Sequence, residues 1–326
     1  MGVRRVCSAV CVGGLLVLAG CAQAAEDDAQ LDGTQSPAAT AGGNAAPESG
    51  DPTLTGRLLF SRFDEDSHMF LTTHISRPDG SEEREIAMPS TEGGGRWSRS
   101  GDYIAVPTSL TDGRIGTAIM TPDGTIARVL DIPDDSLNLA CTVWSPDDQR
   151  LACEGWDEVD ASRNGIYTIS SSDGSELVRL TETPADLADF VGDYSPDGTM
   201  FLFKRTTEED PAPLMVVPVA GGAETLLSDL QVEDPGRYSP DGTTILTSAG
   251  GRIVLLDTAG VEVGEIVEPG SYLFGPVWSP DGEHVGYSGD EAGAHADIFT
   301  ATPDGTDRRQ VTSTPDNEIR VEWGRN

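Results

Sequence analysis

The chain has 326 residues, with 55 acidic residues against 21 Lys and Arg, and a formal net charge of −34 at pH 7. Surfaces that bind nucleic acids gather Lys and Arg to neutralise phosphates, so this balance excludes a nucleic acid as the partner. Lys204 is the single lysine, and the 38 Gly and 21 Pro are typical of a turn-rich β protein rather than a helical one.

The first 21 residues are typical of an export signal. Two arginines at positions 4 and 5 precede an apolar stretch, 6–18, that is too short and too rich in glycine to span a bilayer as a stable helix. The stretch ends in Leu-Ala-Gly-Cys, which resembles a bacterial lipobox, in which the cysteine is acylated and becomes the mature N-terminus. We therefore predict that residues 1–21 are a lipoprotein signal and that Cys21 carries the lipid. The alternative is an ordinary secretory signal cleaved at Ala-Gln-Ala, 22–24.

Residues 22–55 are predicted to form a tether without a folded core. Up to residue 50 they are mainly Ala, Gly, Ser, Pro, Gln and acidic residues, and Leu31 is the one large apolar side chain. Such a segment cannot bury enough apolar surface to offset the entropy of ordering it. A flexible chain of this length reaches on the order of 30 Å, so the folded domain, 56–326, is expected to hang from a membrane.

A repeat of 40 to 50 residues organises this domain. Each full unit has an aromatic residue followed by a turn of the type Ser-Pro-Asp-Gly. In this turn Pro presets φ at the second position, and Gly takes the left-handed conformation that closes a hairpin. These aromatic-plus-turn segments lie at 97–101, 144–148, 194–198, 238–242 and 278–282, and a sixth aromatic residue follows at Trp323.

A second series of turns interleaves with the first, at 79–80, 123–124, 173–174, 221–222, 259–260 and 304–305. Short β-type runs flank both series, so each unit supplies four strands. This pattern predicts an all-β, six-bladed propeller of four-stranded antiparallel blades. The first unit lacks an opening strand and residues 319–323 form an opening strand alone, so the C-terminal strand is expected to join the N-terminal blade and close the ring. The repeated aromatic residues are expected to fill the space between blades.

Two cysteines remain in the predicted domain, Cys141 and Cys153, on either side of the turn at 144–148. An exported chain meets an oxidising compartment, so we predict a disulfide between adjacent antiparallel strands. Two free buried thiols or a metal site are the alternatives.

The Trp/Tyr-Ser-Pro-Asp-Gly units resemble the repeats of TolB-type propellers, and they are similar to those in the propeller domains of prolyl oligopeptidase-like enzymes. The resemblance covers roughly residues 56–326 and implies a six-bladed propeller that holds a partner. The sequence departs from it at Arg99 and Ser100, where Pro-Asp is missing, and at Asp148, where Gly is expected. It has a lipobox and a tether where TolB has an α/β domain. The G-x-S-x-G motif of a nucleophilic serine is also missing, which argues against a serine hydrolase.

The residue before each repeat aromatic is expected to approach the central channel, because the opening strand of a blade is the innermost. These six residues are Arg96, Val143, Asp193, Arg237, Val277 and Glu322. The two arginines and two acids are candidates for binding a small polar ligand. Ion pairs that only satisfy the channel wall are the alternative.

Four histidines are present, two expected in strands (His74 and His284) and two in loops (His68 and His295). They form no metal-binding spacing, and we predict no cofactor and no metal site.

Acidic clusters lie mainly in the long loops, at 64–66, 134–135, 157–160, 208–210 and 290–291. In an up-and-down blade the long loops share one end of the ring, so that end is expected to be electronegative and to attract an envelope protein with a basic surface. The alternative is an acidic surface that serves solubility.

These patterns favour a non-catalytic lipoprotein, anchored at the outer face of a cytoplasmic membrane or in the periplasm, whose propeller binds or scaffolds a protein partner. One alternative is a propeller hydrolase or lyase that uses a divalent cation held by channel acids such as Asp193. Another is a sensor that captures a peptide or a sugar at the mouth of the channel.

Overall fold

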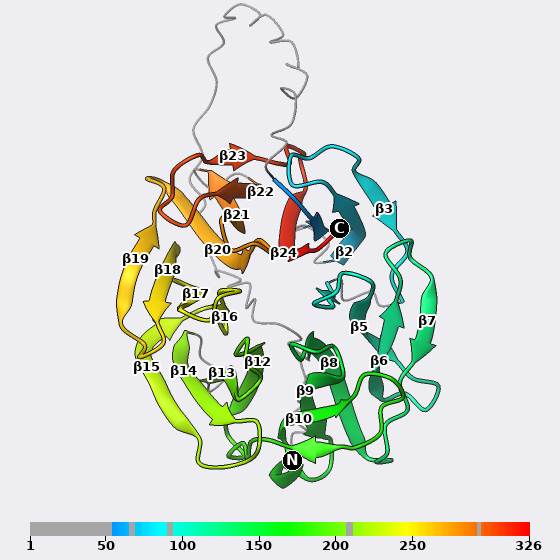
Figure 1. The fold of residues 1–326 in the computed structure, drawn as a ribbon. Coiled ribbons are helices and arrows are strands. Elements are labelled where there is room, and N and C mark those ends of the chain that lie inside the picture. The colour runs from blue at the N-terminus through cyan, green and yellow to red at the C-terminus, as the bar shows by residue number, and fades with distance from the viewer. Residues whose placement is uncertain (1–53, 65–68, 90–93, 207–210, 292–294) are drawn as a thin grey trace, which may run out of the picture.

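The computed structural model describes residues 54–64, 69–89, 94–206, 211–291 and 295–326. Within these residues, six four-stranded antiparallel sheets are arranged in a ring (Figure 1). The predicted six-bladed propeller is therefore confirmed. The proposed signal and tether, with Cys21, lie outside the described residues, as do His68 and the acidic cluster at 208–210.

The blades follow one another around the ring in chain order, and each runs from the channel outward. Blades 1 to 3 consist of β24 (Asn317–Gly324), β1 (Arg57–Asp64), β2 (Met69–Ser76) and β3 (Arg84–Ile86); β4 (Arg96–Trp97), β5 (Ile104–Ser109), β6 (Ile115–Met120) and β7 (Ile126–Val129); and β8 (Leu137–Trp144), β9 (Arg150–Asp157), β10 (Gly165–Ser170) and β11 (Val178–Arg179). Blades 4 to 6 consist of β12 (Ala188–Tyr194), β13 (Met200–Thr206), β14 (Ala212–Pro218) and β15 (Thr225–Val232); β16 (Arg237–Tyr238), β17 (Thr244–Ala249), β18 (Arg252–Asp257) and β19 (Glu262–Ile266); and β20 (Ser271–Trp278), β21 (Val285–Glu291), β22 (Ala296–Ala301) and β23 (Arg309–Gln310). A 3-10 helix, η1 (Ala161–Arg163), lies between β9 and β10.

The ring closes through blade 1, as predicted. Strand β24 supplies the innermost strand of this blade and pairs antiparallel with β1, with Trp323 opposite Leu58 and Ile319 opposite Ser61. The N-terminal and C-terminal strands therefore cover each other's edges, which removes the open sheet edge that an incomplete ring would leave.

The repeated turns all lie at one end of the ring, which we call the turn end; the opposite end, with the connections between blades, is the loop end. In four of these turns the Ser hydroxyl donates to the Asp carboxylate at 2.6 Å, namely in Ser145–Asp147, Ser195–Asp197, Ser239–Asp241 and Ser279–Asp281. Gly198, Gly242 and Gly282 take positive φ values, as the turn requires. Asp148 replaces this glycine in blade 3 and takes the same left-handed conformation, with φ of 58°.

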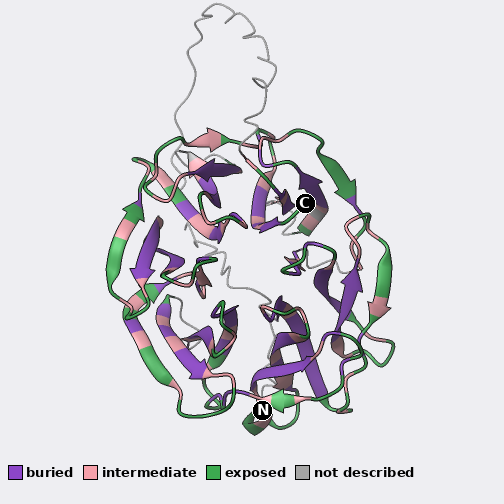
Figure 2. Ribbon diagram, viewed as in Figure 1, coloured by how far each residue is buried: buried purple, intermediate pink, exposed green. Residues whose placement is uncertain are grey.

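The repeated aromatic residues fill the spaces between blades, as predicted. Trp144 of blade 3, for example, belongs to a buried cluster with Ala105 and Ile119 of blade 2, and Tyr194 of blade 4 packs with Val143 and Ile166 of blade 3. Burial follows the same plan: the inner strands are mostly buried and the outermost strands mostly exposed (Figure 2). The core is thus a ring of wedges rather than one central cluster.

The predicted disulfide is present. Cys141 on β8 and Cys153 on β9 lie directly opposite each other, both are fully buried, and their sulfur atoms are bonded.

Lys204, the single lysine of the sequence, is also fully buried. Its ammonium donates to the carbonyl of Glu233 at 2.5 Å and lies 5.3 Å from the centre of the Phe190 ring. Every basic side chain on the described surface apart from histidine is therefore an arginine.

Candidate functional site

A cavity of about 240 Å³ occupies the turn end of the central channel, and we call it the turn-end chamber. All six residues that precede the repeat aromatics line it, one from each blade: Arg96, Val143, Asp193, Arg237, Val277 and Glu322. Because the inner strands follow one another around the ring, like residues face each other across the channel. Arg96 of blade 2 lies opposite Arg237 of blade 5, and Glu322 of blade 1 lies opposite Asp193 of blade 4.

Two arginines converge on one carboxylate at the floor of this chamber. Glu322 Oε1 pairs with the guanidinium of Arg237 and lies 3.5 Å from Nε of Arg96. Arg96 also donates to the carbonyl of Gly192 at 2.7 Å, so it reaches from blade 2 to blade 4. Burial and the charge of Arg237 lower the pKa of Arg96 to about 10, which still leaves it charged at neutral pH.

The other candidate acid, Asp193, has a different partner. Its carboxylate pairs with the guanidinium of Arg99, from the turn of blade 2, and its side chain is only 6% exposed. The sequence predicted that the two arginines and two acids before the aromatics could pair among themselves. The structure brings all four to one chamber but pairs only Glu322 with Arg96 and Arg237.

Two departures from the repeat compensate each other in the turn that carries Arg99. At Arg99 and Ser100 the usual Pro-Asp is missing, so an additional backbone N–H is present. The carboxylate of Asp148, in the next blade, accepts from the backbone N–H groups of Arg99 and Ser100, at 2.7 and 2.9 Å. In the regular units the corresponding glycine instead lies against the proline of the preceding blade, as Gly242 does against Pro196.

Indole side chains hold the backbone of the floor arginines. Trp144 donates from Nε1 to the carbonyl of Arg96 at 3.0 Å, and Trp278 donates to the carbonyl of Arg237 at 3.3 Å. Each tryptophan belongs to the blade after its acceptor. The tryptophans that fill the space between blades therefore also fix the backbone positions of the two arginines.

A second cavity, of about 150 Å³, continues the channel toward the loop end, and we call it the loop-end chamber. Both chambers are lined by Arg96, Arg237 and Glu322, so these three residues form a waist between them. Glu154 of β9 borders the loop-end chamber, and its carboxylate accepts from the backbone N–H of Val191 at 3.2 Å. The surrounding blades enclose it, and this burial raises the pKa of Glu154 to about 7.

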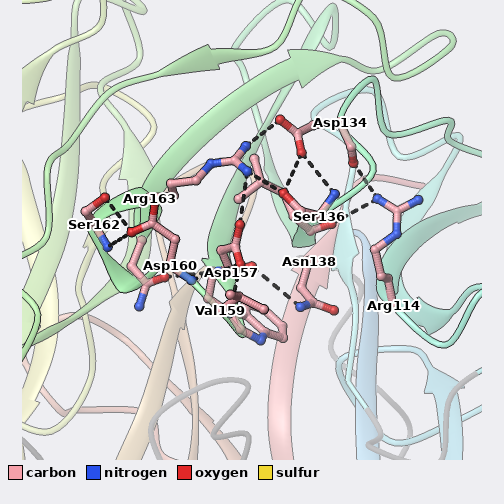
Figure 3. A network of polar contacts seen from close by, with 12 residues as sticks. Arg114, Asp134, Ser136, Asn138, Asp157, Val159, Asp160, Ser162 and Arg163 are labelled. Atoms are coloured by element: carbon pink, nitrogen blue, oxygen red, sulfur yellow. Dashed lines mark hydrogen bonds and ion pairs between the residues drawn. The ribbon is translucent and has the colours of Figure 1, made fainter.

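The acids of the loop end are partly bound within the protein (Figure 3). Arg163 of η1 pairs with Asp134 and, at 3.0 Å, with Asp157. Asp157 also accepts from the backbone N–H groups of Val159 and Asp160, at 2.9 and 3.1 Å, and these bonds lower its pKa. Two of the predicted acidic clusters thus contribute carboxylates to a structural network, while Glu158 and Asp135 are exposed.

The described histidines lie apart from the channel lining. His74 lies in β2 as expected, stacked on Phe60, with its ring nitrogens facing Glu83 at 2.9 Å and Thr72 at 2.8 Å. His295 lies in the loop before β22 as expected, whereas His284 was wrongly placed in a strand: it immediately precedes β21. Among the described residues, no group of three or more His, Cys, Asp or Glu side chains is arranged to hold a metal ion. Nor does any described helix have the length and apolar character needed to cross a bilayer.

Five charged residues that line the two chambers escaped the sequence interpretation: Arg99, Glu154, Asp234, Arg320 and Arg325. Arg99 carried a usable signal, because the missing Pro and the missing Gly fall in neighbouring units, at 99 and 148. Glu154 carried none, because it is an ordinary second-strand residue that reaches the channel beside the irregularity in β12 between Val191 and Asp193.

No protein-family profile matches the sequence, and no curated protein matches it either. Several solved structures, in contrast, have a similar fold. TolB from Acinetobacter baumannii is 19% identical, with a TM-score of 0.63 over 83% of this chain and 67% of that one. A TolB protein from Agrobacterium tumefaciens is 17% identical, with a TM-score of 0.58 over 82% of this chain and 99% of that one. A puromycin hydrolase is 14% identical, with a TM-score of 0.50 over 82% of this chain and 48% of its own. The resemblance to TolB-type propellers is thereby confirmed at the level of the fold.

Proposed function

We propose that this chain is a lipid-anchored protein of the cell envelope whose propeller binds a protein partner and carries out no reaction itself. The observation that carries the proposal is the turn-end chamber, a solvent-reached cavity whose charged side chains come from different blades and meet at one floor. Arginine guanidinium groups are suited to binding, because they stay charged and offer several donors in a fixed plane. The fold shared with two TolB structures supports the same kind of role, since the resemblance implies a propeller that holds a partner.

One feature supports export, and a second indicates where a tether would join the propeller. The buried Cys141–Cys153 bond agrees with an oxidising compartment. The chain enters the propeller at the turn end, where the carbonyl of Thr55 accepts from the Trp323 indole at 2.9 Å. We therefore propose that residues 22–55 connect a lipid on Cys21 to the turn end of the ring.

Anchoring is tested by metabolic labelling with palmitate and by membrane fractionation. We expect the wild-type chain to take up label and to sediment with membranes, and Cys21→Ser to do neither. A Cys21→Ser chain that is labelled and sediments like the wild type would disprove the lipid anchor.

Partner binding is tested by photo-crosslinking in living cells, followed by mass spectrometry. The crosslinking residue is placed at Tyr238, which lines the turn-end chamber, and at Glu158 on the loop end. A matched control is the exposed Val129 on β7, the outermost strand of blade 2. We expect an envelope protein to be captured from at least one end and not from the outer strand. Capture at neither end would refute the proposed function.

A further inference from the structure

The turn-end chamber carries the opposite charge to the rest of the molecule. Six charged side chains line it: the four arginines Arg96, Arg99, Arg237 and Arg325, and the two acids Asp193 and Glu322. The four positive and two negative groups give the chamber a net charge of +2, in a protein whose formal net charge is −34.

The two acids of the chamber are already engaged. Glu322 is shared by two arginines, and Asp193 is taken by Arg99. Arg325 is exposed at the rim, and among the described residues its guanidinium has no hydrogen-bond or ion-pair partner. The excess positive charge is therefore divided between the floor, where one carboxylate serves two arginines, and the rim.

The floor arginines also repel each other. Arg96 and Arg237 project from opposite blades toward Glu322, and the Arg237 charge acts together with burial to lower the pKa of Arg96. An added anion at this place would relieve that repulsion and would form charge-assisted hydrogen bonds with guanidinium groups that remain fixed by the blades.

We infer that the turn-end chamber binds a carboxylate carried on a peptide segment of the partner. This inference rests on the proposed function and specifies the chemistry of the partner at this site. The chamber walls favour a peptide over a free anion, because four prolines and the half-buried rings of Tyr238 and Trp278 surround the charged floor: Pro146, Pro196, Pro240 and Pro280. An acidic side chain flanked by apolar residues matches both the floor and the walls.

The inference is tested by calorimetric titration of the purified propeller, residues 22–326 without the lipid, with the peptide acetyl-Ala-Phe-Glu-Phe-Ala-amide. The matched peptide carries Gln in place of Glu. We expect the Glu peptide to bind at least tenfold more tightly than the Gln peptide, and its affinity to fall as salt is raised. Equal binding of the two peptides, or no binding of the Glu peptide, would overturn the inference.

Three arginine variants locate the site. Arg237→Gln removes a floor cation and should weaken the Glu peptide at least tenfold. Arg325→Gln removes an exposed rim cation, leaves the core untouched, and should weaken it about threefold. Arg77→Gln makes the same charge change at the same end of the ring but outside the chamber, where Arg77 pairs with the exposed Glu82; it should bind as the wild type does. An equal loss in all three variants would show a general charge effect and would overturn the site.

Sodium acetate separates a peptide site from a small-anion site. Acetate should compete only at concentrations far above those of the peptide; acetate that binds as tightly as the peptide would overturn the peptide part of the inference. The crosslinking experiment keeps the two proposals apart. If the partner is captured equally by wild type, Arg237→Gln and Arg325→Gln, the proposed function stands and the inference fails. If the Glu peptide binds as expected but no envelope protein is captured, the carboxylate site in the chamber stands and the proposed protein partner fails.

Discussion

The two ends of the ring use the same residue types to opposite effect. At the turn end, the aspartates of the repeated turns are bound to the serine two residues before them and to backbone N–H groups, as Asp197 is to Ser195 and Thr199. These bonds lower their pKa values, and four arginines of this end line the channel. At the loop end, arginines such as Arg163 and Arg205 are committed to carboxylates of the loops. Net charge alone does not give the sign of a binding surface; the local partner of each charge decides it.

The largest effect is expected at the loop end, from removal of the cation that pairs with a buried carboxylate. Arg205 donates from Nε and Nη2 to the two carboxylate oxygens of Asp189, at 2.6 and 2.7 Å, and the Asp189 side chain is fully buried. Arg205→Met leaves that carboxylate without its cation, which costs about 3–5 kcal/mol when a buried pair is broken from one side. Urea unfolding of the two proteins measures the loss.

The matched change at the turn end is Arg77→Met, because Arg77 and its partner Glu82 are mostly exposed. An exposed pair contributes little, so the unfolding curve should coincide with that of the wild type. If Arg77→Met is as damaging as Arg205→Met, arginines at the two ends do not differ in the way described here.

The second prediction concerns the pH response of the loop-end chamber. The pKa of Glu154 is raised to about 7 in the folded protein, from an ordinary value of 4.5. Between these values the folded state holds a proton that the unfolded state has lost, so this group lowers stability as pH rises, by at most about 1.4 kcal/mol per pH unit, and the penalty is complete above pH 7. Glu154→Gln should remove this slope in unfolding experiments between pH 5 and 8.

The charges that act on Glu154 come from several elements. They belong to Arg96 on β4, Lys204 on β13 and Arg320 on β24, with Asp234, Arg237 and Glu322 also lining the chamber. Burial raises the pKa of Glu154 into this range, so the slope is assigned to Glu154. Glu158→Gln, an exposed change in the same segment, is the control and should retain the wild-type slope. A slope that persists in Glu154→Gln would contradict the assignment.

Much of the fold was predictable because each unit repeats its own local signal. Pro and Gly in the turns fix hairpins, the aromatic residues mark inner strands, and the incomplete first and last units indicate how the ring closes. The ring of residues before the aromatics was predictable for the same reason: position within a blade sets which residue approaches the channel. The pairing inside the channel was not, because it depends on side chains from several blades, as when Arg99 of blade 2 takes Asp193 of blade 4. The contact of Glu154 with Val191 was not predictable for the same reason, because it joins blade 3 to blade 4.

A smaller effect is expected where the turn end departs from its repeat. Asp148 accepts from the backbone N–H groups of Arg99 and Ser100. Asp148→Asn keeps the side-chain shape and a residue that tolerates the left-handed conformation, but one amide oxygen cannot replace two carboxylate oxygens. We expect a loss of about 1 kcal/mol in the free energy of unfolding. A variant as stable as the wild type would show that the two bonds contribute nothing.

The smallest stability effect, and the sharpest test of the turn end, comes from restoring the repeat. Arg99→Pro alone leaves a carboxylate oxygen of Asp148 without its donor, and Asp148→Gly alone leaves two N–H groups without their acceptor. Together they recreate the proline–glycine contact of the regular blades, such as Pro196 with Gly242. The double variant should therefore be more stable than the sum of the single changes indicates, with a coupling of about 0.5 kcal/mol or more.

The same double variant tests the chamber, because it lacks the Arg99 guanidinium. Asp193 would then face the chamber without its cation, and the Glu peptide should bind several-fold more weakly. A double variant that folds well and binds the peptide unchanged would show that the departure from the repeat serves the turn alone and not the chamber.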